Sequence, residues 1–385
     1  MFFPMGIPAQ AAEAKSATIN ATIGQLTDGR GGSMPLPAIA EHLSNISLNA
    51  ATLYTAQGGN TALRDAWGAR LRAHGNGPMT SPFCTVGLTH GLSLLADLFV
   101  DEDTDVLLPS PGWGNYDHIF GVRGGGRIHR YPVFEGGEFS KDAVRKVLEQ
   151  VQTKGVLLLN FPGNPTGYTP TPEELSPWLE AIRSSSKPIV VICDDAYAGF
   201  VYEDGHVIHS PFHALADADP STVLTVKVDG ATKELCFFGG RVGFVTFGAS
   251  GAAGRALDTK IKGMARATVS TGPAISQALV LSALQSPNLG EQQRAQFQLS
   301  QNRYRKLKRC LAAAQIRTIP FNSGFFALIP VEGDPESLRT RLLAKGVGVV
   351  AFPQHSAIRV AFSSTADEDI ETLVTAIATE IRGQP

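Results

Sequence analysis

Short apolar runs alternate with amphipathic stretches along most of the chain, a pattern that predicts β-strands separated by α-helices. The runs that we interpret as strands are residues 80–86, 105–108, 155–160 and 188–193. The stretches with helical spacing are residues 60–72, 92–100 and a segment that begins near Thr171. Because the strands are apolar throughout, we expect a mostly parallel central sheet sandwiched by helices, which is an α/β fold.

Residues 223–248 hold two further apolar runs, each long enough for a buried strand, joined by a short polar segment. Lys233 lies in this segment, and Arg241 follows eight residues later. A lysine held between buried strands is desolvated, which lowers its pKa and leaves a neutral amine that can attack a carbonyl. Arg241 can neutralise an anionic group beside it. Taken alone, the pair also fits two solvated charges at strand ends.

The last third of the chain predicts a second structural unit. A long, highly charged helix is expected over residues 290–315. The strands expected after it are near residues 325–331, 347–352 and 358–362. We therefore expect a large domain over residues 26–289 and a smaller α/β domain over residues 290–385. Near the N-terminus, residues 22–37 are rich in glycine and proline and predict an irregular loop.

Composition narrows the class of protein. Of 385 residues, 43% are hydrophobic and 18% are charged, which is typical of a globular enzyme. The 33 basic and 35 acidic residues nearly cancel, so nucleic acid and an acidic membrane surface are not expected as partners. No apolar run reaches the roughly 18 residues of a membrane span, and the first residues do not have the pattern of a secretory leader, so we expect no targeting segment. We expect a cytoplasmic protein that acts on small molecules.

The four cysteines lack the paired spacing of a disulfide framework or a metal site. They are Cys84, Cys193, Cys236 and Cys310. Three of them lie in or beside apolar runs, which is typical of buried, reduced thiols. We therefore expect neither a disulfide nor a bound metal.

Polar and aromatic residues follow the ends of several expected strands, where ligand sites gather in parallel sheets. These residues are Thr89, Trp113, Asn164, Asp194, Tyr197 and Lys233, and the apolar Leu88 lies next to Thr89. Leu88 and Thr89 precede an expected helix, so their N–H groups and the helix dipole can bind a phosphate. Asp194 can pair with a protonated ring nitrogen and Trp113 can stack on the ring. Tyr197 and Asn164 can donate hydrogen bonds to a ring oxygen, so an aldehyde cofactor on Lys233 would find its partners here.

Four motifs give these residues a family resemblance. They are NPTG at 164–167, DDAYAGF at 194–200, a lysine and arginine eight residues apart at Lys233 and Arg241 followed by Gly243, and IRVAFS around Arg359. In order and spacing the chain resembles the fold-type I pyridoxal-phosphate aminotransferases of class I/II, which are aspartate aminotransferase-like. The resemblance implies a homodimer with shared active sites that uses an amino acid and a 2-oxo acid in a ping-pong cycle. It also implies that residues 1–25 join the small domain, with 6–10 as a lid.

The resemblance also implies a role for each residue. Lys233 forms the Schiff base with pyridoxal 5'-phosphate and then moves the proton between the substrate Cα and the cofactor. The other cofactor contacts are Arg241, Leu88 and Thr89 on the phosphate, Asp194 on the ring nitrogen, Tyr197 and Asn164 on the ring oxygen, and Trp113 stacked on the ring. Tyr54 reaches the phosphate across the dimer interface. The substrate α-carboxylate is received by Arg359, Asn164 and the backbone of Gly24.

Some positions depart from the family pattern. Gly230 and Thr232 occupy places where many relatives carry a phosphate-binding serine, so Thr232 or Ser270 is expected to supply that contact. His90 stands where a glutamine or glycine is common. Asp195, next to Asp194, is expected to be a solvated neighbour.

The substrate is left open by the sequence. Arg266 either binds a substrate side-chain carboxylate from the other subunit, which selects aspartate or glutamate, or belongs to a solvated basic face with Lys260 and Lys262. Aromatic donors are the alternative to acidic ones. Another reaction on the same fold, by a C–S β-lyase, racemase or decarboxylase, is the alternative to transamination.

Overall fold

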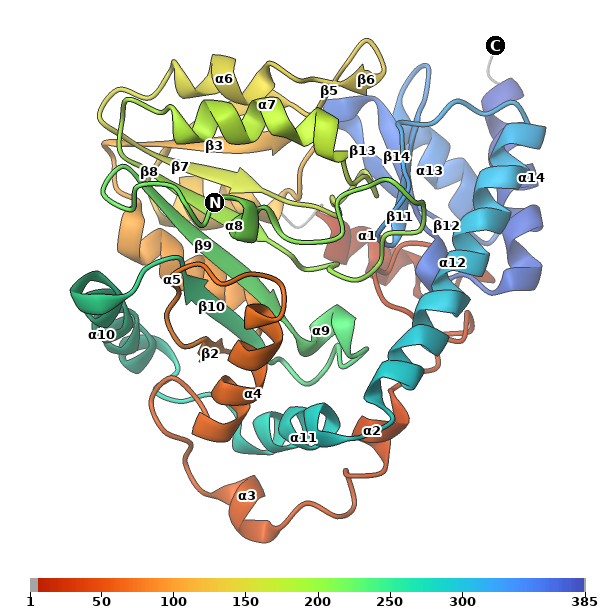
Figure 1. Cartoon of the computed structure of the whole chain (residues 1–385). Helices are drawn as coiled ribbons and strands as arrows, with labels where there is room; N and C mark the ends of the chain where they lie inside the picture. Colours follow the sequence, from red (N-terminus) through yellow and green to blue (C-terminus); the bar gives the residue numbers. More distant parts are fainter. Residues whose placement is uncertain (1–5, 384–385) are drawn as a thin grey trace.

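A seven-stranded sheet forms the centre of the computed structural model, which describes residues 6–383 (Figure 1). In spatial order its strands are β2 (Phe83–Thr85), β10 (Gly243–Phe247), β9 (Val223–Gly230), β8 (Ile189–Asp194), β7 (Lys154–Leu159), β3 (Thr104–Ser110) and β4 (Arg127–Pro132). Only β10 runs antiparallel to its neighbours. The expected mostly parallel sheet is therefore confirmed, and all five parallel strands end at the same edge.

Helices cover both faces of this sheet because alternate residues of each strand point to opposite sides. On one face, Val106 of β3 packs into a core with α5 (Gly87–Phe99) and α10 (Gly251–Thr268). On the other face, the next residue, Leu107, packs into a core with α6 (Ala143–Leu148) and α7 (Pro172–Arg183). Figure 1 shows α6 and α7 together along the outer side of the sheet. The layered arrangement follows directly from strands that are apolar on both faces.

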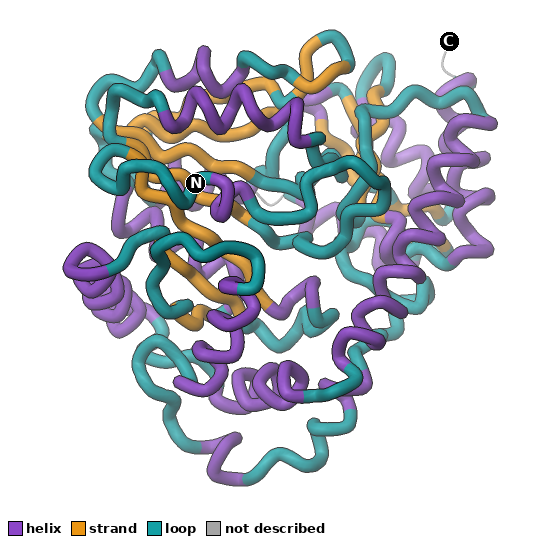
Figure 2. Tube along the Cα trace, viewed as in Figure 1, coloured by secondary structure: helices purple, strands orange, loops and turns teal. Residues whose placement is uncertain are grey.

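A third apolar core closes the β2 side of the sheet. It joins α4 (Thr61–Arg72) and α11 (Ala274–Gln285) to β10, with the ring of Trp67 stacked on Phe244 at a centroid distance of 4.4 Å. The remaining short elements of this part are α2 (Pro37–Ala40), α3 (Leu48–Thr52), α8 (Pro211–Ala214), α9 (Ala231–Glu234), β5 (Phe134–Glu135) and β6 (Glu138–Phe139). Figure 2 shows α3 at the end of a long loop, away from the sheet.

The C-terminal part forms a separate layer beside the main sheet. Its elements are α12 (Leu289–Ala313), β11 (Phe326–Pro330), α13 (Pro335–Ala344), β12 (Val347–Gly348), β13 (Val350–Phe352), β14 (Ala357–Ala361) and α14 (Ile370–Arg382). Strands β11, β14 and β13 form an antiparallel sheet. The N-terminal elements α1 (Ile7–Glu13) and β1 (Ile19–Asn20) join this layer, because β1 pairs in parallel with β12. The domain boundaries at residues 26 and 290 stay a prediction.

Most of the expected elements are present, with two differences. Helix α5 begins at Gly87 rather than near Leu92, so Leu88 and Thr89 lie in its first turn instead of before it. Strand β4 was missed, because its polar residues hide the apolar pattern. The start of α7 was predicted well: Thr171 and Glu174 form a capping box. Within residues 6–383, no helix is long and apolar enough to cross a lipid bilayer.

Candidate active site

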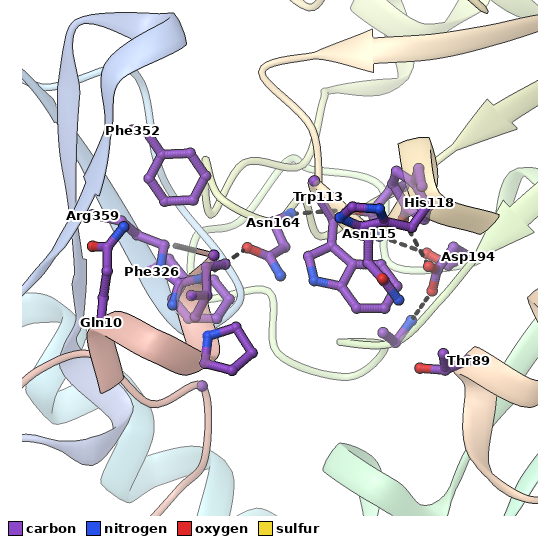
Figure 3. Close-up of a pocket in the computed structure, with 18 of the residues that line it drawn as sticks. Gln10, Thr89, Trp113, Asn115, His118, Asn164, Asp194, Phe326, Phe352 and Arg359 are labelled. Atoms are coloured by element: carbon purple, nitrogen blue, oxygen red, sulfur yellow. Dashed lines mark hydrogen bonds between the residues drawn. The ribbon is translucent and has the colours of Figure 1, made fainter. Parts of the chain in front are cut away.

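A cavity of about 740 Å³ lies between the carboxyl ends of the main sheet and the C-terminal layer. Figure 3 shows residues from both sides facing each other across it, with Arg359 and Phe352 at one end and Asp194 and Thr89 at the other. The predicted site residues that line it are Gly24, Leu88, Thr89, Trp113, Asn164, Asp194, Tyr197, Lys233, Arg241 and Arg359. The structure therefore brings together residues that lie up to 335 positions apart in the printed sequence, from Gly24 to Arg359.

Lys233 lies in the one-turn helix α9, which joins β9 to β10. A Cβ on Gly230, just before this helix, would lie 2.6 Å from Gly243 Cα, so a glycine lets the two strand ends run close together. Lys233 Nζ lies 5.1 Å from the centroid of the Tyr197 ring. Burial lowers the pKa of Lys233 to about 8; Asp194 opposes this shift and Arg241 adds to it. An appreciable fraction of the amine is thus neutral near neutral pH, as a lysine nucleophile requires.

Asp194 ends strand β8 and is held by two donors. The Tyr116 hydroxyl donates to Asp194 Oδ2 at 2.7 Å, and the Ala196 N–H donates to Oδ1 at 3.1 Å. Burial raises the pKa of Asp194, while the Tyr116 hydrogen bond and the charge of Lys233 lower it. The two oxygens are therefore fixed in orientation, and the charge is stabilised by specific partners in place of water.

Sequence reasoning missed Tyr116 and Asn160. The Tyr116 ring packs edge-to-face on Trp113, three residues earlier, at a centroid distance of 5.3 Å. Asn160 donates from Nδ2 to the backbone oxygen of Asp194 at 2.9 Å and accepts the Asn164 N–H at 2.9 Å. Asn160 lies directly after the end of β7, and Tyr116 lies in the segment that follows β3; a position beyond a strand end is the signal that could have found them.

The prediction for Asp195 was wrong. Its side chain is buried and forms an ion pair with Lys227, which also lies 3.4 Å from Asp229. The Asp195 N–H still donates to Val228 O at 2.9 Å, so the alternation of the strand continues and turns this side chain away from Asp194. Burial raises the pKa of Asp195 to about 6, against the effect of Lys227.

An anion cradle is built at the start of α5. Val86, the residue before the helix, supplies no side-chain cap, and Leu88 and Thr89 of the first turn line the cavity. The first N–H groups of a helix have no acceptor within the helix itself. Gly87 has a φ of 75°, and a Cβ there would lie 2.8 Å from Arg241 Cζ. Glycine therefore lets the Arg241 guanidinium lie against the turn. The N-terminus of a helix together with an adjacent arginine fits a phosphate group.

His90 stabilises the start of α5 through two hydrogen-bond contacts. Its Nδ1 accepts the Val86 N–H at 3.1 Å, and its Nε2 lies 3.1 Å from Thr268 Oγ1. Burial lowers the pKa of His90, which keeps the ring in the neutral form that can accept the Val86 hydrogen. The unusual histidine is thus explained by its link between the helix start and the end of α10.

Arg359 is a buried cation of the cavity, with 2% of its surface exposed. Its Nη1 donates to Asn164 Oδ1 at 3.1 Å and its Nη2 donates to Thr22 O at 2.7 Å. Its Nε has no hydrogen-bond partner among the described residues, and no acidic side chain there pairs with it. Burial lowers the pKa of Arg359 to about 10, so it remains charged at neutral pH. A buried guanidinium in this state fits a carboxylate ligand.

Gly24 completes this end of the cavity. A Cβ on Gly24 would lie 2.5 Å from the ring of Phe326, over which the Arg359 guanidinium is placed at 4.1 Å from the centroid. Any larger residue would displace the ring that supports Arg359. This close approach is a physical reason for a glycine at position 24.

Four predicted site residues do not line the cavity of their own chain. They are Tyr54, Thr232, Arg266 and Ser270. Tyr54 is 92% exposed, and Arg266 Nη1 donates to Ser270 Oγ at 3.3 Å on the surface. The hydroxyl of Thr232 is buried without a hydrogen-bond partner among residues 6–383. A hydrogen bond of 3.4 Å from Thr55 Oγ1 to Gly272 O places the Tyr54 and Ser270 segments side by side. Their predicted roles stay predictions.

Residues 17–377 match the family model of aminotransferase class I and II, so the chain belongs to that family. Members of this family generally depend on pyridoxal phosphate. The aspartate/prephenate aminotransferase of Thermus thermophilus is 26% identical over 335 residues, which cover 83% of this chain and 80% of that protein. The chain spans about half the length of the first curated relatives that it matches.

Solved structures support the fold. An aminotransferase from Anaerococcus prevotii has a TM-score of 0.87 at 21% identity and covers 97% of this chain and 95% of its own. An aspartate aminotransferase from Thermus thermophilus, solved with maleate, has a TM-score of 0.80 at 21% identity and covers 98% and 97%. Both are similar along nearly the whole chain, which agrees with the sheet order and the C-terminal layer described above.

Proposed function

We propose that this protein is an aminotransferase that moves an amino group between an amino acid and a 2-oxo acid in a ping-pong cycle, with pyridoxal 5'-phosphate as cofactor. One observation carries the proposal: a single cavity holds a half-buried lysine with a lowered pKa, a fixed carboxylate, an anion cradle and a buried arginine without an acidic partner among the described residues. Family membership supports the same activity.

The residues present fit this cofactor. The cavity of about 740 Å³ is large enough for it, because small-molecule sites typically have volumes of about 300–1,000 Å³. The phosphate would be held by the start of α5 and by Arg241, the ring nitrogen by Asp194, and the ring oxygen by Tyr197 and Asn164. Trp113 would cover the ring. When bound, the cofactor draws electrons from the bonds at the substrate Cα and carries the amino group between the two substrates.

Lys233 is proposed to hold the cofactor through Nζ and then to move the proton at the substrate Cα. Its lowered pKa supports both roles, since each begins from a neutral amine. Asp194 holds a proton at the ring nitrogen because its charge is fixed by Tyr116 and Ala196. Arg359 binds the substrate carboxylate with the guanidinium edge that Asn164 and Thr22 leave open.

We also propose a cytoplasmic homodimer with shared active sites. The support is a group of exposed apolar side chains around α3, where Leu48 is 76% exposed, Leu53 63% and Tyr54 92%. Apolar side chains exposed to this extent on one segment are typical of an interaction surface. Tyr54 is then placed to reach the phosphate of a second copy, as the resemblance implies.

The test of the proposed activity is the Lys233→Ala variant. Wild-type protein should absorb visible light from its bound cofactor and transfer amino groups to a 2-oxo acid. Lys233→Ala should lose the covalent attachment and essentially all transfer. Lys141→Ala, which removes an exposed lysine outside the cavity, is the matched control and should behave as wild type. Transfer retained by Lys233→Ala would overturn the proposal.

A further inference from the structure

The cations of the cavity leave one part of it without positive charge. Among the described residues, the lysine and arginine side chains that line the cavity are Lys233, Arg241 and Arg359. In the proposed function Lys233 attaches the cofactor, Arg241 binds its phosphate and Arg359 binds the substrate carboxylate. A substrate bound by its carboxylate to Arg359 must therefore place its side chain against other groups.

Those other groups are mainly apolar. Ile7 and Pro8 of α1 and Phe352 and Pro353 at the end of β13 line the cavity beside Arg359, and we call these four residues the apolar wall. Phe352 lies with its ring centroid 5.7 Å from the Arg359 guanidinium. Figure 3 shows Phe352 beside Arg359, with Trp113 farther along the cavity. An apolar substrate side chain in this space would be stabilised by burial and by contact with the aromatic rings.

The apolar wall is held in place by a buried amide. Gln10 of α1 donates from Nε2 to Ala351 O at 3.2 Å and accepts the Ala351 N–H on Oε1 at 2.7 Å. Its side chain thus pairs with the edge of β13 as a neighbouring strand would. This pair fixes Ile7 and Pro8 against Phe352 before any substrate binds, so the wall is a built surface of this chain.

Among the described residues, the acidic side chains that line the cavity are Asp194 and Glu336, and Glu336 is already paired. Glu336 lines the cavity and accepts from Arg339 Nε at 2.9 and 3.0 Å. Arg339 is buried and also pairs with Glu13 at 2.8 Å. Two carboxylates share one guanidinium, so this cluster offers no cation to a third carboxylate. An acidic side chain placed here would be desolvated beside negative charge, which is unfavourable.

We propose that the amino donor carries a neutral, apolar side chain that lies against the apolar wall, and that acidic amino acids are disfavoured. This inference rests on the proposed function and narrows its substrate class. The preference for an apolar donor depends on the apolar wall of this chain. A preference for an acidic donor would instead require Arg266 to be supplied by a second copy.

The test mixes the cofactor-loaded enzyme with single amino acids in the absence of any 2-oxo acid and follows the cofactor absorbance. The second-order rate constants for phenylalanine and leucine should exceed those for aspartate and glutamate by about tenfold or more. Faster reaction with aspartate or glutamate would overturn the inference, most clearly if Arg266→Ala abolished that preference. If no amino acid reacts, the proposed function itself fails, which is a distinguishable result.

Two variants test the wall directly. Ile7→Arg places a cation in the wall and should shift the ratio of aspartate to phenylalanine rate constants towards aspartate by about tenfold. Ala12→Arg adds the same charge at an exposed position of α1 outside the cavity and should leave the ratio unchanged. Equilibrium binding of 3-phenylpropionate and succinate gives the same comparison without a reaction. Equal ratios in the two variants would show that the substrate side chain lies elsewhere.

Discussion

Arg359 and Asn164 join the two sides of the cavity through a hydrogen bond of 3.1 Å from Nη1 to Oδ1. Arg359 belongs to strand β14 of the C-terminal layer, and Asn164 follows strand β7 of the main sheet. The bond fixes the guanidinium in orientation and leaves the buried Nε without a partner among residues 6–383. The receptor for a carboxylate therefore exists before the substrate binds, which lowers the entropy cost of binding.

Arg359→Lys is expected to weaken substrate binding strongly. A lysine keeps the charge but lacks the planar, two-point donor set, and we expect a loss of about 2 kcal/mol or more, a factor of roughly 30 in affinity. The measurement is the substrate concentration dependence of cofactor conversion. Arg145→Lys, on an exposed surface of α6, is the control. Unchanged dependence in Arg359→Lys would contradict its role as the carboxylate receptor.

Tyr116→Phe is expected to weaken cofactor binding. The change removes the donor to Asp194 that holds the pKa of this carboxyl down, so the neutral form of Asp194 becomes more favourable. A hydrogen bond to a charged group contributes about 1.5–3 kcal/mol, which predicts at least a tenfold loss of cofactor affinity. The measurement is a fluorescence titration of cofactor-free protein.

Tyr131→Phe is the matched control for that change. The Tyr131 hydroxyl is also buried, but it donates to Leu158 O inside the core and does not contact the cavity. Tyr131→Phe should lower the free energy of unfolding without the same loss of affinity. Equal affinity losses in both variants would show that Tyr116 acts only through general stability.

Gly87→Ala is expected to damage the anion cradle. Both Gly87 and Gly125 have a positive φ, 75° and 77°, so alanine at either position costs about 1–2 kcal/mol of backbone strain. Only at Gly87 would the new Cβ meet Arg241, whereas nothing lies within 4 Å of a Cβ at Gly125. Gly87→Ala should therefore reduce the affinity for pyridoxal phosphate relative to pyridoxal, and Gly125→Ala should not. Titration with both compounds measures the ratio of these two affinities. The same ratio in Gly87→Ala and Gly125→Ala would show that the start of α5 does not bind the phosphate.

The attachment of cofactor to Lys233 should depend on pH with a midpoint near 8. The amine must be neutral to attack, so the rate rises with pH through the lowered pKa of about 8 and then levels off. Asp194 raises the pKa of Lys233, so Asp194→Asn should move the midpoint to lower pH. Stopped-flow mixing of cofactor with cofactor-free protein measures both. A midpoint near the ordinary lysine value of about 10.4 would contradict the desolvation argument.

The main sheet, and the edge at which the site residues gather, could be predicted because both depend on local sequence patterns. Most strands of the sheet are apolar at nearly every residue. Asp194 ends strand β8, and Asn164 and Lys233 lie within five residues after the ends of β7 and β9. Strand β4 was missed because its side chains are polar, and the start of α5 was placed too late because this helix begins on Gly87.

The contacts between distant segments could not be predicted from local patterns. Tyr116 and Asp194 are 78 residues apart, and Gln10 and Ala351 are 341 apart. Nothing in the sequence near Asp195 shows that Lys227 lies beneath it, because the pairing of β8 with β9 decides that. Such contacts depend on sheet order and register, which follow from the whole chain.

The central claim is tested most directly by counting product in a single half-reaction. Cofactor-loaded enzyme is mixed with an excess of phenylalanine, without any 2-oxo acid, and the 2-oxo acid and ammonia formed are measured. We expect one 2-oxo acid per active site, no ammonia, and a full return of the cofactor absorbance when a 2-oxo acid is added. The same mixture is made with cysteine, whose thiol can leave from Cβ as a lyase requires. Absence of the 2-oxo acid from phenylalanine, or continued formation of pyruvate and ammonia from cysteine without an acceptor, would contradict the proposed transamination.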